Sequence, residues 1–345
     1  MIQKQSWSYI ILGFCVIMIT TYVGNNIKQS FENKDTIDDY EMVKKYLLND
    51  AALYGNNRPK LWIHSKYEVN ARKWKNFMSR NTTDLNQPYL YLTIQSIINH
   101  CGDDFHVCLI DDDSFEHLIP SWTISLATTP EPMRSRYRDI GMLQLLYIYG
   151  GMRVPNSFLC TKNLIEIYNQ GINHESSLFL TEKQSSSFNT QTFVPDIQFI
   201  GSKKENAKLQ SLIQTLNDAS STHFQNETEF TGHIEKWCQD SIVQQNMQLL
   251  DGQMIGIKTS DGKPVLLEHL MSNDYLKFDD KYLYGIYIPS NEILRRPKFQ
   301  YYTILPYEDV LNADNIMSKY FKISMVDGVD EYYKKRTKKI SAISI

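Results

Sequence analysis

A concentration of charged side chains marks the segment between residues 134 and 139. Arg134, Arg136 and Arg138 occupy alternate positions, and Asp139 follows the last of them. The preceding residues 129–132 read TPEP, and proline is tolerated in the first turn of a helix, so the arginines are predicted to lie near a helix N-terminus. Cations there oppose the macrodipole, and an anion such as a phosphate would relieve the repulsion. The segment therefore predicts an anion-binding site, with a solvated basic face as the alternative.

A run of acidic residues provides a second candidate for chemistry. Asp111, Asp112 and Asp113 follow a short apolar segment at residues 107–110 and precede Ser114. The run contains D-x-D, and carboxylate oxygens are the ligands that divalent cations prefer. An acidic side chain can also accept an orphan backbone N–H at the start of a helix. We favour this cap in a solvated loop over a metal site.

The elements that position these residues follow from apolar patterning. Residues 61–63 are predicted to form a buried strand, residues 89–100 a helix, and residues 107–110 a second strand. Strand, helix and strand in this order imply a parallel pair with a right-handed crossover. The arginine-bearing helix should run from residue 129 to about residue 149 and end at Gly150-Gly151.

Later elements are predicted less regularly. Short apolar runs indicate strands, a longer amphipathic stretch indicates a helix, and a polar stretch indicates an insertion. The strands are expected at residues 178–180, 197–201 and 282–288, the helix at 204–216 and the insertion at 217–231.

The amino-acid composition limits the classes of partner that the protein could bind. Charged residues make up 22% of the chain and the formal net charge is -3, so no global positive field favours nucleic acid. Aromatic residues make up 12%, which a disordered chain would not carry. The chain is predicted to be globular and not to bind nucleic acid.

The N-terminal region has the properties of a membrane anchor. Residues 7–27 carry no charge and are mostly apolar, which is long enough to cross a bilayer as a helix. A cleaved signal peptide is the rival, but no A-x-A-like site follows. We expect a single-pass type II protein with a short tail at 1–6, a stem at 28–59, one domain at 60–330 and a basic tail at 331–345.

We expect the anchor to lie in a Golgi-like, ER-like or host-derived membrane and the domain to be luminal or exterior. This placement has two chemical consequences. The sequons at Asn81 and Asn226 would be glycosylated. Four cysteines follow the anchor and could form two disulfides in any of three pairings, whereas a cytosolic domain would keep them reduced. They are Cys101, Cys108, Cys160 and Cys238.

The tract at residues 135–151, SRYRDIGMLQLLYIYGG, resembles the signature S-D-x-x-R-x-x-x-L-Y-x-Y-G-G-x-[YW]-x-D-x-D of the capsular-polysaccharide-synthesis and DXD sugar-binding-region glycosyltransferases. Asp139 falls on the first aspartate, and Gly150-Gly151 on the glycine pair. Residues 61–64, 107–114 and 198–202 are similar to other family strands, so the likeness spans about residues 60–216. The resemblance implies an α/β fold, namely a GT-A-like, Rossmann-type mixed sheet flanked by helices.

The departures from the signature concern the metal. Met142 stands where the family has arginine, and Pro155-Asn156-Ser157 stands where D-x-D is expected. These neutral groups are poor ligands, so strong Mn²⁺ or Mg²⁺ binding is not expected. Arg153 and Lys162 flank this loop, and with the helix arginines they could replace the ion at a diphosphate. A packing strand at residues 154–159 is the alternative.

The resemblance also implies roles. His64, Ser65 and Tyr137 would line a nucleoside pocket, Asp139 would accept hydrogen bonds from ribose or sugar hydroxyls, and Gly150-Gly151 would let the backbone approach the donor. The expected site comprises Asp139 and Arg153 as catalytic groups and His64, Ser65, Arg134, Tyr137, Gly150, Gly151, Asn156 and Ser157 as donor-binding groups. Each has a structural alternative: His64 a satisfied core histidine, Tyr137 a core aromatic, Asp139 an ion-pair partner of Arg136 or Arg138.

The function expected from this combination is transfer of a hexose from a UDP- or GDP-sugar to a glycan or lipid-linked acceptor, without a metal ion or with weak activity. An inactive glycan-binding or structural membrane protein on the same fold is the alternative. A third possibility is an unrelated fold, which would lack the parallel strand pair between residues 61 and 110.

Overall fold

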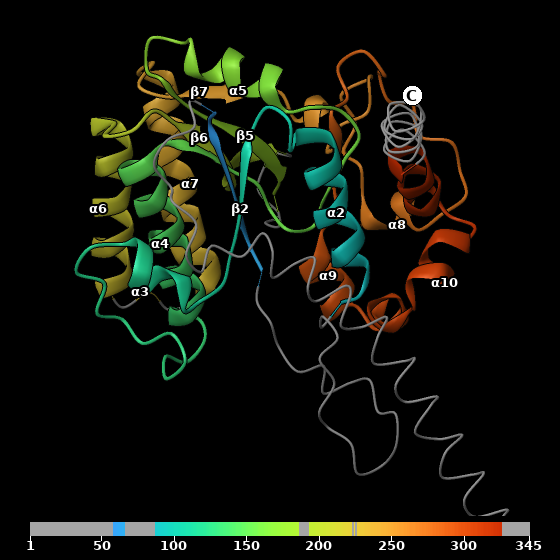
Figure 1. The fold of residues 1–345 in the computed structure, drawn as a ribbon, viewed down its shortest axis with the longest axis horizontal. Coiled ribbons are helices and arrows are strands. Elements are labelled where there is room, and N and C mark those ends of the chain that lie inside the picture. The colour runs from blue at the N-terminus through green and yellow to red at the C-terminus, as the bar shows by residue number, and fades with distance from the viewer. Residues whose placement is uncertain (1–57, 66–86, 186–192, 223, 225, 326–345) are drawn as a thin grey trace, which may run out of the picture. The chain divides into compact units, whose positions relative to one another are not determined.

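The computed structural model describes residues 58–65, 87–185, 193–222, 224 and 226–325 (Figure 1). The predicted anchor at 7–27, the stem up to residue 57, the sequon at Asn81 and the tail at 331–345 lie outside the described residues. Within the described part of the chain, every helix is too short or too polar to cross a membrane.

A six-stranded mixed sheet forms the centre of the fold. Its strands are β1 (Lys60–His64), β2 (His106–Ile110), β3 (Gly151–Arg153), β5 (Leu178–Gln184), β6 (Phe193–Ser202) and β7 (Gln248–Leu250). Their order is β2-β1-β3-β6-β5-β7, and only β6 runs antiparallel to its neighbours. The predicted mixed α/β sheet flanked by helices is confirmed, as is the parallel pairing of the first two strands.

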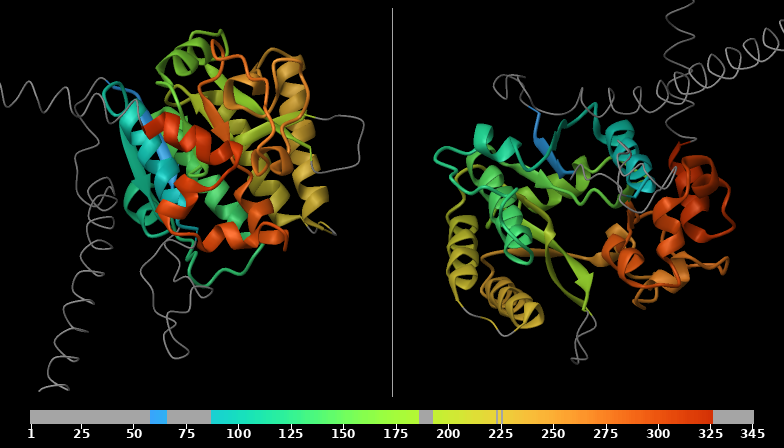
Figure 2. Two further views of the ribbon diagram at one scale, coloured as in Figure 1. Left: turned by 90° about the vertical axis from the view of Figure 1, so that its right-hand side faces the viewer. Right: turned by 90° about the horizontal axis from the view of Figure 1, so that it is seen from below.

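One face of the sheet is covered by α4 (Met133–Tyr149), α6 (Ala207–Ser221) and α7 (Glu227–Val243), as Figures 1 and 2 show. Their apolar side chains pack with Trp62 and with alternate residues of β2, β5 and β6. Alternation along each strand places Trp62 on this face and leaves Leu61 and Ile63 for the other. The buried stripe of α4 therefore fixes the position of its polar first turns at the edge of the sheet.

The opposite face is covered by α2 (Tyr89–Cys101), α5 (Ile165–Ile172) and a small antiparallel sheet of β4 (Phe158–Cys160) and β8 (Gly285–Tyr287). A second core joins α2 and this small sheet to the C-terminal third. That third contains η1 (Gly252–Ile255), α8 (Leu267–Leu270), α9 (Ser290–Arg295), η2 (Gln300–Ile304) and α10 (Tyr307–Asn312).

Three expectations about local structure are wrong. The predicted polar insertion at 217–231 contains the end of α6 and the start of α7, because its polar residues lie on solvent faces while Ala219 and Phe230 are buried. The helix predicted at 204–216 starts later, where the Asn206 side chain accepts from two backbone amides. The strand predicted at 282–288 is only the three-residue β8.

Gly150 and Gly151 turn the chain from α4 into β3, as the sequence predicts for the helix end. Gly150 has φ 70° and Gly151 φ 105°, a region that side chains disfavour. A Cβ on Gly151 would lie 2.2 Å from the Lys60 carbonyl oxygen. The missing side chain therefore lets β3 pack beside β1.

Candidate functional site

A cavity of about 550 Å³ opens at the carboxyl ends of the parallel strands. His64 ends β1 and Arg153 ends β3, and both line it. The connection from β1 leads to β2 on one side of it, and the connection from β2 passes back over β1 to β3 on its other side, so the crossover direction reverses here. Open α/β sheets bind ligands at such a switch point. The topology therefore marks this cavity as the candidate site.

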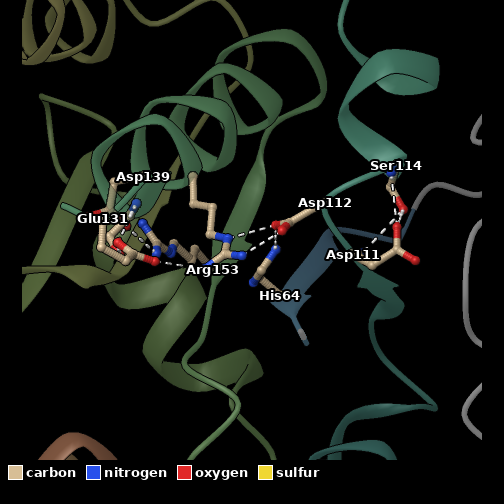
Figure 3. Close-up of polar contacts among 9 residues, drawn as sticks. His64, Asp111, Asp112, Ser114, Glu131, Asp139 and Arg153 are labelled. Atoms are coloured by element: carbon tan, nitrogen blue, oxygen red, sulfur yellow. Dashed lines mark hydrogen bonds and ion pairs between the residues drawn. The ribbon is translucent and has the colours of Figure 1, made fainter. Parts of the chain in front are cut away.

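The floor of the cavity holds an ion pair between Asp139 and Arg153 (Figure 3). Arg153 Nη2 donates to Asp139 Oδ1 at 2.7 Å, and Gln198 Nε2 donates to the same oxygen at 2.8 Å. The Arg153 side chain is only 7% exposed and that of Asp139 21%. The structure thus brings the two predicted catalytic residues together, although we expected Arg136 or Arg138 as the alternative partner of Asp139.

A second charged group lies beside the first. Arg138 donates from Nε to Asp112 Oδ1 at 2.7 Å and from Nη2 to Oδ2 at 2.5 Å. His64 Nε2 lies 2.9 Å from Asp112 Oδ1, and its ring stacks on Phe115. Figure 3 shows Asp112 beside His64, which lies at the end of β1. The arrangement orients the His64 ring and ties the N-terminal part of α4 to the strand edge.

The environment sets the charge of this group. Burial lowers the pKa of His64, and the hydrogen bond to Asp112 only partly offsets that effect. Burial alone would raise the pKa of Asp112, but hydrogen bonds from His64 and Arg138 hold it well below its usual range. His64 is therefore neutral near pH 7 and donates from Nε2 to an ionised Asp112.

These shifts predict the pH dependence of stability. A depressed His64 pKa favours the folded state above the unfolded histidine pKa, near 6.5, and this contribution is lost as the pH falls below it. The depressed Asp112 pKa acts in the same direction at lower pH, below the ordinary aspartate pKa of 3.8. Urea unfolding between pH 3 and pH 8 should therefore show stability falling on acidification in two steps. The His64→Phe variant should lose the upper step, and an unchanged profile would contradict the assignment.

Asp111 and Asp112 of the acidic run make different contacts. Asp111 Oδ1 accepts from the Ser114 amide at 3.0 Å and from the Ser114 hydroxyl at 2.6 Å, which closes the turn before α3 (Ser114–Leu118). Asp113, at the N-cap position of α3, makes no cap hydrogen bond with its side chain. Asp112 belongs to the charged group described above. Within the described residues, no three His, Cys, Asp or Glu side chains are grouped to hold a metal ion.

The loop after β3 also lines the cavity. It carries Pro155, Asn156 and Ser157, at the position where the resemblance implies metal-binding acids. Thr93 Oγ1 of α2 donates to the Asn156 carbonyl at 2.5 Å, and the Ile288 amide donates to the Ser157 carbonyl at 3.1 Å. The alternative of a strand over residues 154–159 is only partly right, since β4 begins at Phe158 and pairs with β8.

Other predicted residues lie elsewhere and do not line the cavity. Ser65 is buried, and its amide donates to the Ile110 carbonyl. Tyr137 packs against the helix-covered core, and Arg134 Nε donates to the Thr129 carbonyl at 2.8 Å. Gly150 and Gly151 make close backbone packing rather than an approach to this cavity. The structure therefore does not bring these five residues together with Asp139 and Arg153 at the cavity.

Two more cations of the predicted basic clamp also lie away from the cavity. Arg136 pairs with Glu227 at 2.6 Å and stacks on Phe230 at 3.8 Å. Lys162 contacts the backbone carbonyls of Asp280 and Lys281. The clamp is therefore smaller than the sequence predicts.

Sequence reasoning missed charged residues of the cavity on three elements. Lys183 on β5 and Asp196 on β6 line the cavity, as do Glu292 and Arg295 of α9. Lys183 also pairs with Glu235 of α7 at 2.9 Å. β5 extends through Gln184, beyond the apolar run at 178–180 that predicted it. Its second half is polar, Glu182-Lys183-Gln184, so hydrophobicity gave no indication that the strand continues.

Asp196 is the most buried acid of the cavity. It is 2% exposed and accepts from the Gln198 amide at 3.1 Å. Burial raises its pKa, against the effect of the Lys183 charge. Burial lowers the pKa of Lys183, but the Asp196 and Glu235 carboxylates outweigh that and raise it. Lys183 is therefore protonated near pH 7 and carries its positive charge beside Asp196 and Glu235.

Charge balance limits what the cavity can bind. Arg138 and Arg153 each already contact a carboxylate. Arg295 is exposed, and its side chain makes no hydrogen bond or ion pair with the other described residues. An anionic ligand would meet Arg295 as an uncompensated cation. It would share the three other cations of the cavity, Lys183 included, with the carboxylates that they already contact.

No model of a known protein family matches the chain, and neither does any curated protein. The functional argument therefore depends on the cavity and its residues.

Proposed function

We propose that the protein is a glycosyltransferase with a GT-A-like domain that transfers a hexose from a UDP- or GDP-sugar to a glycan or lipid-linked acceptor. The observation that supports this most is the Asp139–Arg153 pair inside the cavity at the switch point of the sheet. His64, Asn156 and Ser157, which the family resemblance also implies, line the same cavity. A volume of about 550 Å³ falls within the usual range for a small-molecule site.

Asp139 is suited to bind a sugar or ribose hydroxyl. Its Oδ1 accepts from Arg153 and Gln198, while Oδ2 has no hydrogen bond to any of the described residues. An ionised carboxylate has capacity for further donors, and a hydroxyl hydrogen bond to a charged group is stronger than a neutral one. The ion pair keeps Asp139 in place in the wall of the cavity.

The diphosphate of the donor needs positive charge as its bond to the sugar breaks. The electron pair of that bond goes to the diphosphate oxygen. The acceptor hydroxyl forms the new bond to the sugar, and its proton passes to the departing diphosphate. In the loop of residues 155–157 the side chains offer an amide, a hydroxyl and a proline ring, which are poor substitutes for two carboxylates around a divalent ion. We assign the compensating charge to Arg153 and Arg295.

The cellular setting is part of the same proposal. The uncharged residues 7–27 would anchor the chain, and the domain would face a lumen or the exterior. An acceptor on a membrane lipid or on a membrane glycoprotein would then be held close to the cavity.

A binding protein without catalysis is the second candidate, and one observation favours it. Both Arg138 and Arg153 are neutralised by aspartates, so little positive charge is left for a diphosphate. A neutral sugar would need no such charge, since carboxylates, amides and hydroxyls suffice for its hydroxyl groups.

Release of nucleoside diphosphate separates the two candidates. The full-length protein in detergent should release UDP or GDP from at least one nucleotide sugar in the presence of EDTA, faster when an acceptor glycan is added. Binding of free glycans without release from any donor would instead identify the binding protein.

Removing the uncompensated cation should weaken donor binding. We expect Arg295→Gln to raise the Kd of the nucleotide sugar about fivefold to tenfold, because a charged hydrogen bond to phosphate is lost. The matched control is Lys298→Gln, which removes an exposed cation three residues away and outside the cavity. Calorimetric titration checks both, and equal affinities in the two variants would remove Arg295 from the site.

A further inference from the structure

The sulfur atoms of Cys101 and Cys160 are in contact inside the protein. Cys101 is the last residue of α2 and Cys160 the last residue of β4. Their Sγ atoms lie 3.8 Å apart, and both side chains are fully buried. A disulfide has a sulfur–sulfur distance of about 2.05 Å, so the atoms need to approach by less than ~2 Å. Rotation of the two side chains supplies much of this movement.

The backbone around the pair is already fixed by hydrogen bonds. The Cys160 amide donates to Ser96 Oγ of α2 at 2.9 Å, and Ser324 Oγ donates to the Cys160 carbonyl at 2.7 Å. The chain segments therefore hold the two sulfurs together in the folded state.

The other described cysteines lie on a different face of the sheet. Cys108 of β2 and Cys238 of α7 belong to the core under α4, α6 and α7, which contains neither Cys101 nor Cys160. Cys108 Sγ donates to the His106 carbonyl at 3.4 Å. Among the described residues, Cys101 and Cys160 are the pair whose sulfurs are in contact. The sequence leaves open two disulfides in any of three pairings, whereas the fold supports a single bond, between Cys101 and Cys160.

We propose that Cys101 and Cys160 form a structural disulfide when the chain folds under oxidising conditions, with Cys108 and Cys238 remaining thiols. The expectation that this happens in the cell rests on the luminal or exterior placement within the proposed function. The two thiols give up two protons and two electrons as the S–S bond forms. A disulfide oxidant such as oxidised glutathione takes them and becomes two thiols.

The order of events follows from burial. Burial raises the pKa of Cys160, and neighbouring Cys101 adds to the effect, so the reactive thiolate is scarce in the folded protein. Oxidation therefore takes place before α2 closes over β4. The bond would join positions 59 apart in the sequence and constrain the unfolded chain across β2, α4 and β3.

The bond would also act on the candidate site. The loop that carries Asn156 and Ser157 runs directly into β4. Its backbone is held to α2 by the Thr93 hydroxyl. A covalent link between α2 and β4 would fix this wall of the cavity.

The test uses the full-length chain refolded in detergent in a buffer of reduced and oxidised glutathione. Free thiols are alkylated, and non-reducing peptide mapping identifies the pairing. We expect a Cys101–Cys160 disulfide, alkylated Cys108 and Cys238, and a Tm that falls by roughly 5 to 15 °C on reduction. In the double variant C101A/C160A the Tm should not respond to reductant.

Alkylation of both Cys101 and Cys160 in the refolded protein, or a Cys108–Cys238 bond in their place, would overturn the proposal. Donor binding is titrated separately on the same oxidised sample. A correct disulfide without donor binding would count against the enzyme, whereas donor binding without the disulfide would count against this inference alone.

Discussion

Replacing Asp139 with alanine is expected to lower the free energy of unfolding by about 2 to 4 kcal/mol and to abolish binding of a nucleotide sugar. Arg153 is 7% exposed and would keep its contacts with Gln198 and the Ile197 carbonyl but lose its carboxylate. An uncompensated charge at this burial is the main cost. Because the pair lies in an open cavity, solvent reduces that cost below the value for a fully enclosed pair.

Two variants separate stability from binding. Asp139→Asn keeps the shape and a hydrogen bond to Arg153, so it should fold better than Asp139→Ala while still losing donor affinity. Asp218→Ala removes an exposed carboxylate on α6 and should change stability by less than about 0.5 kcal/mol. Urea unfolding and calorimetry measure both effects. Wild-type affinity in Asp139→Asn would mean that Asp139 only supports the fold.

Gly151→Ala should be the most damaging single-methyl change near the site. The new Cβ would lie 2.2 Å from the Lys60 carbonyl oxygen, and φ is 105°. Strain and steric overlap together should cost about 3 kcal/mol or more and separate β3 from β1. Arg153, two residues further along β3, would then leave its place in the cavity. We expect little soluble folded protein, measured by yield and by thermal unfolding.

Two other glycines separate the causes of this effect. Gly262 has φ 75° but nothing within 4 Å of its added Cβ, so Gly262→Ala should cost about 1 kcal/mol from backbone strain alone. Gly232 lies in α7 with open space around it, and Gly232→Ala should stabilise the helix by about 0.5 to 1 kcal/mol. Similar losses in Gly151→Ala and Gly262→Ala would show that the contact with Lys60 is unimportant.

The elements before residue 151 could be predicted well because their patterns are local. The apolar run at 61–63, the periodic stretch at 89–100 and the Gly-Gly stop after α4 each determine their own structure. The last third could not be predicted in this way. Its strands are three residues long and exist through distant partners, β7 beside β5 and β8 beside β4. Such pairings leave little periodicity to read.

The site was predictable in part. The resemblance indicated Asp139, the loop that departs from the family signature indicated Arg153, and the structure puts both in one cavity. Fewer arginines of α4 face the cavity than the sequence predicted, because side chains on a helix point in different directions. Residues two apart on a helix point to nearly opposite sides, so Arg136 and Arg138 could not both face one ligand. The walls formed by Lys183 and Arg295 depend on long-range packing that the sequence does not display.

Calorimetric titration of the full-length protein with UDP- and GDP-hexoses, in EDTA and again in Mn²⁺, tests the central claim most directly. We expect at least one donor to bind with a Kd of about 1 mM or tighter, equally in both buffers and not in Asp139→Asn. Absence of binding by every donor, or binding that requires Mn²⁺, would contradict a metal-independent donor site formed by Asp139 and Arg153.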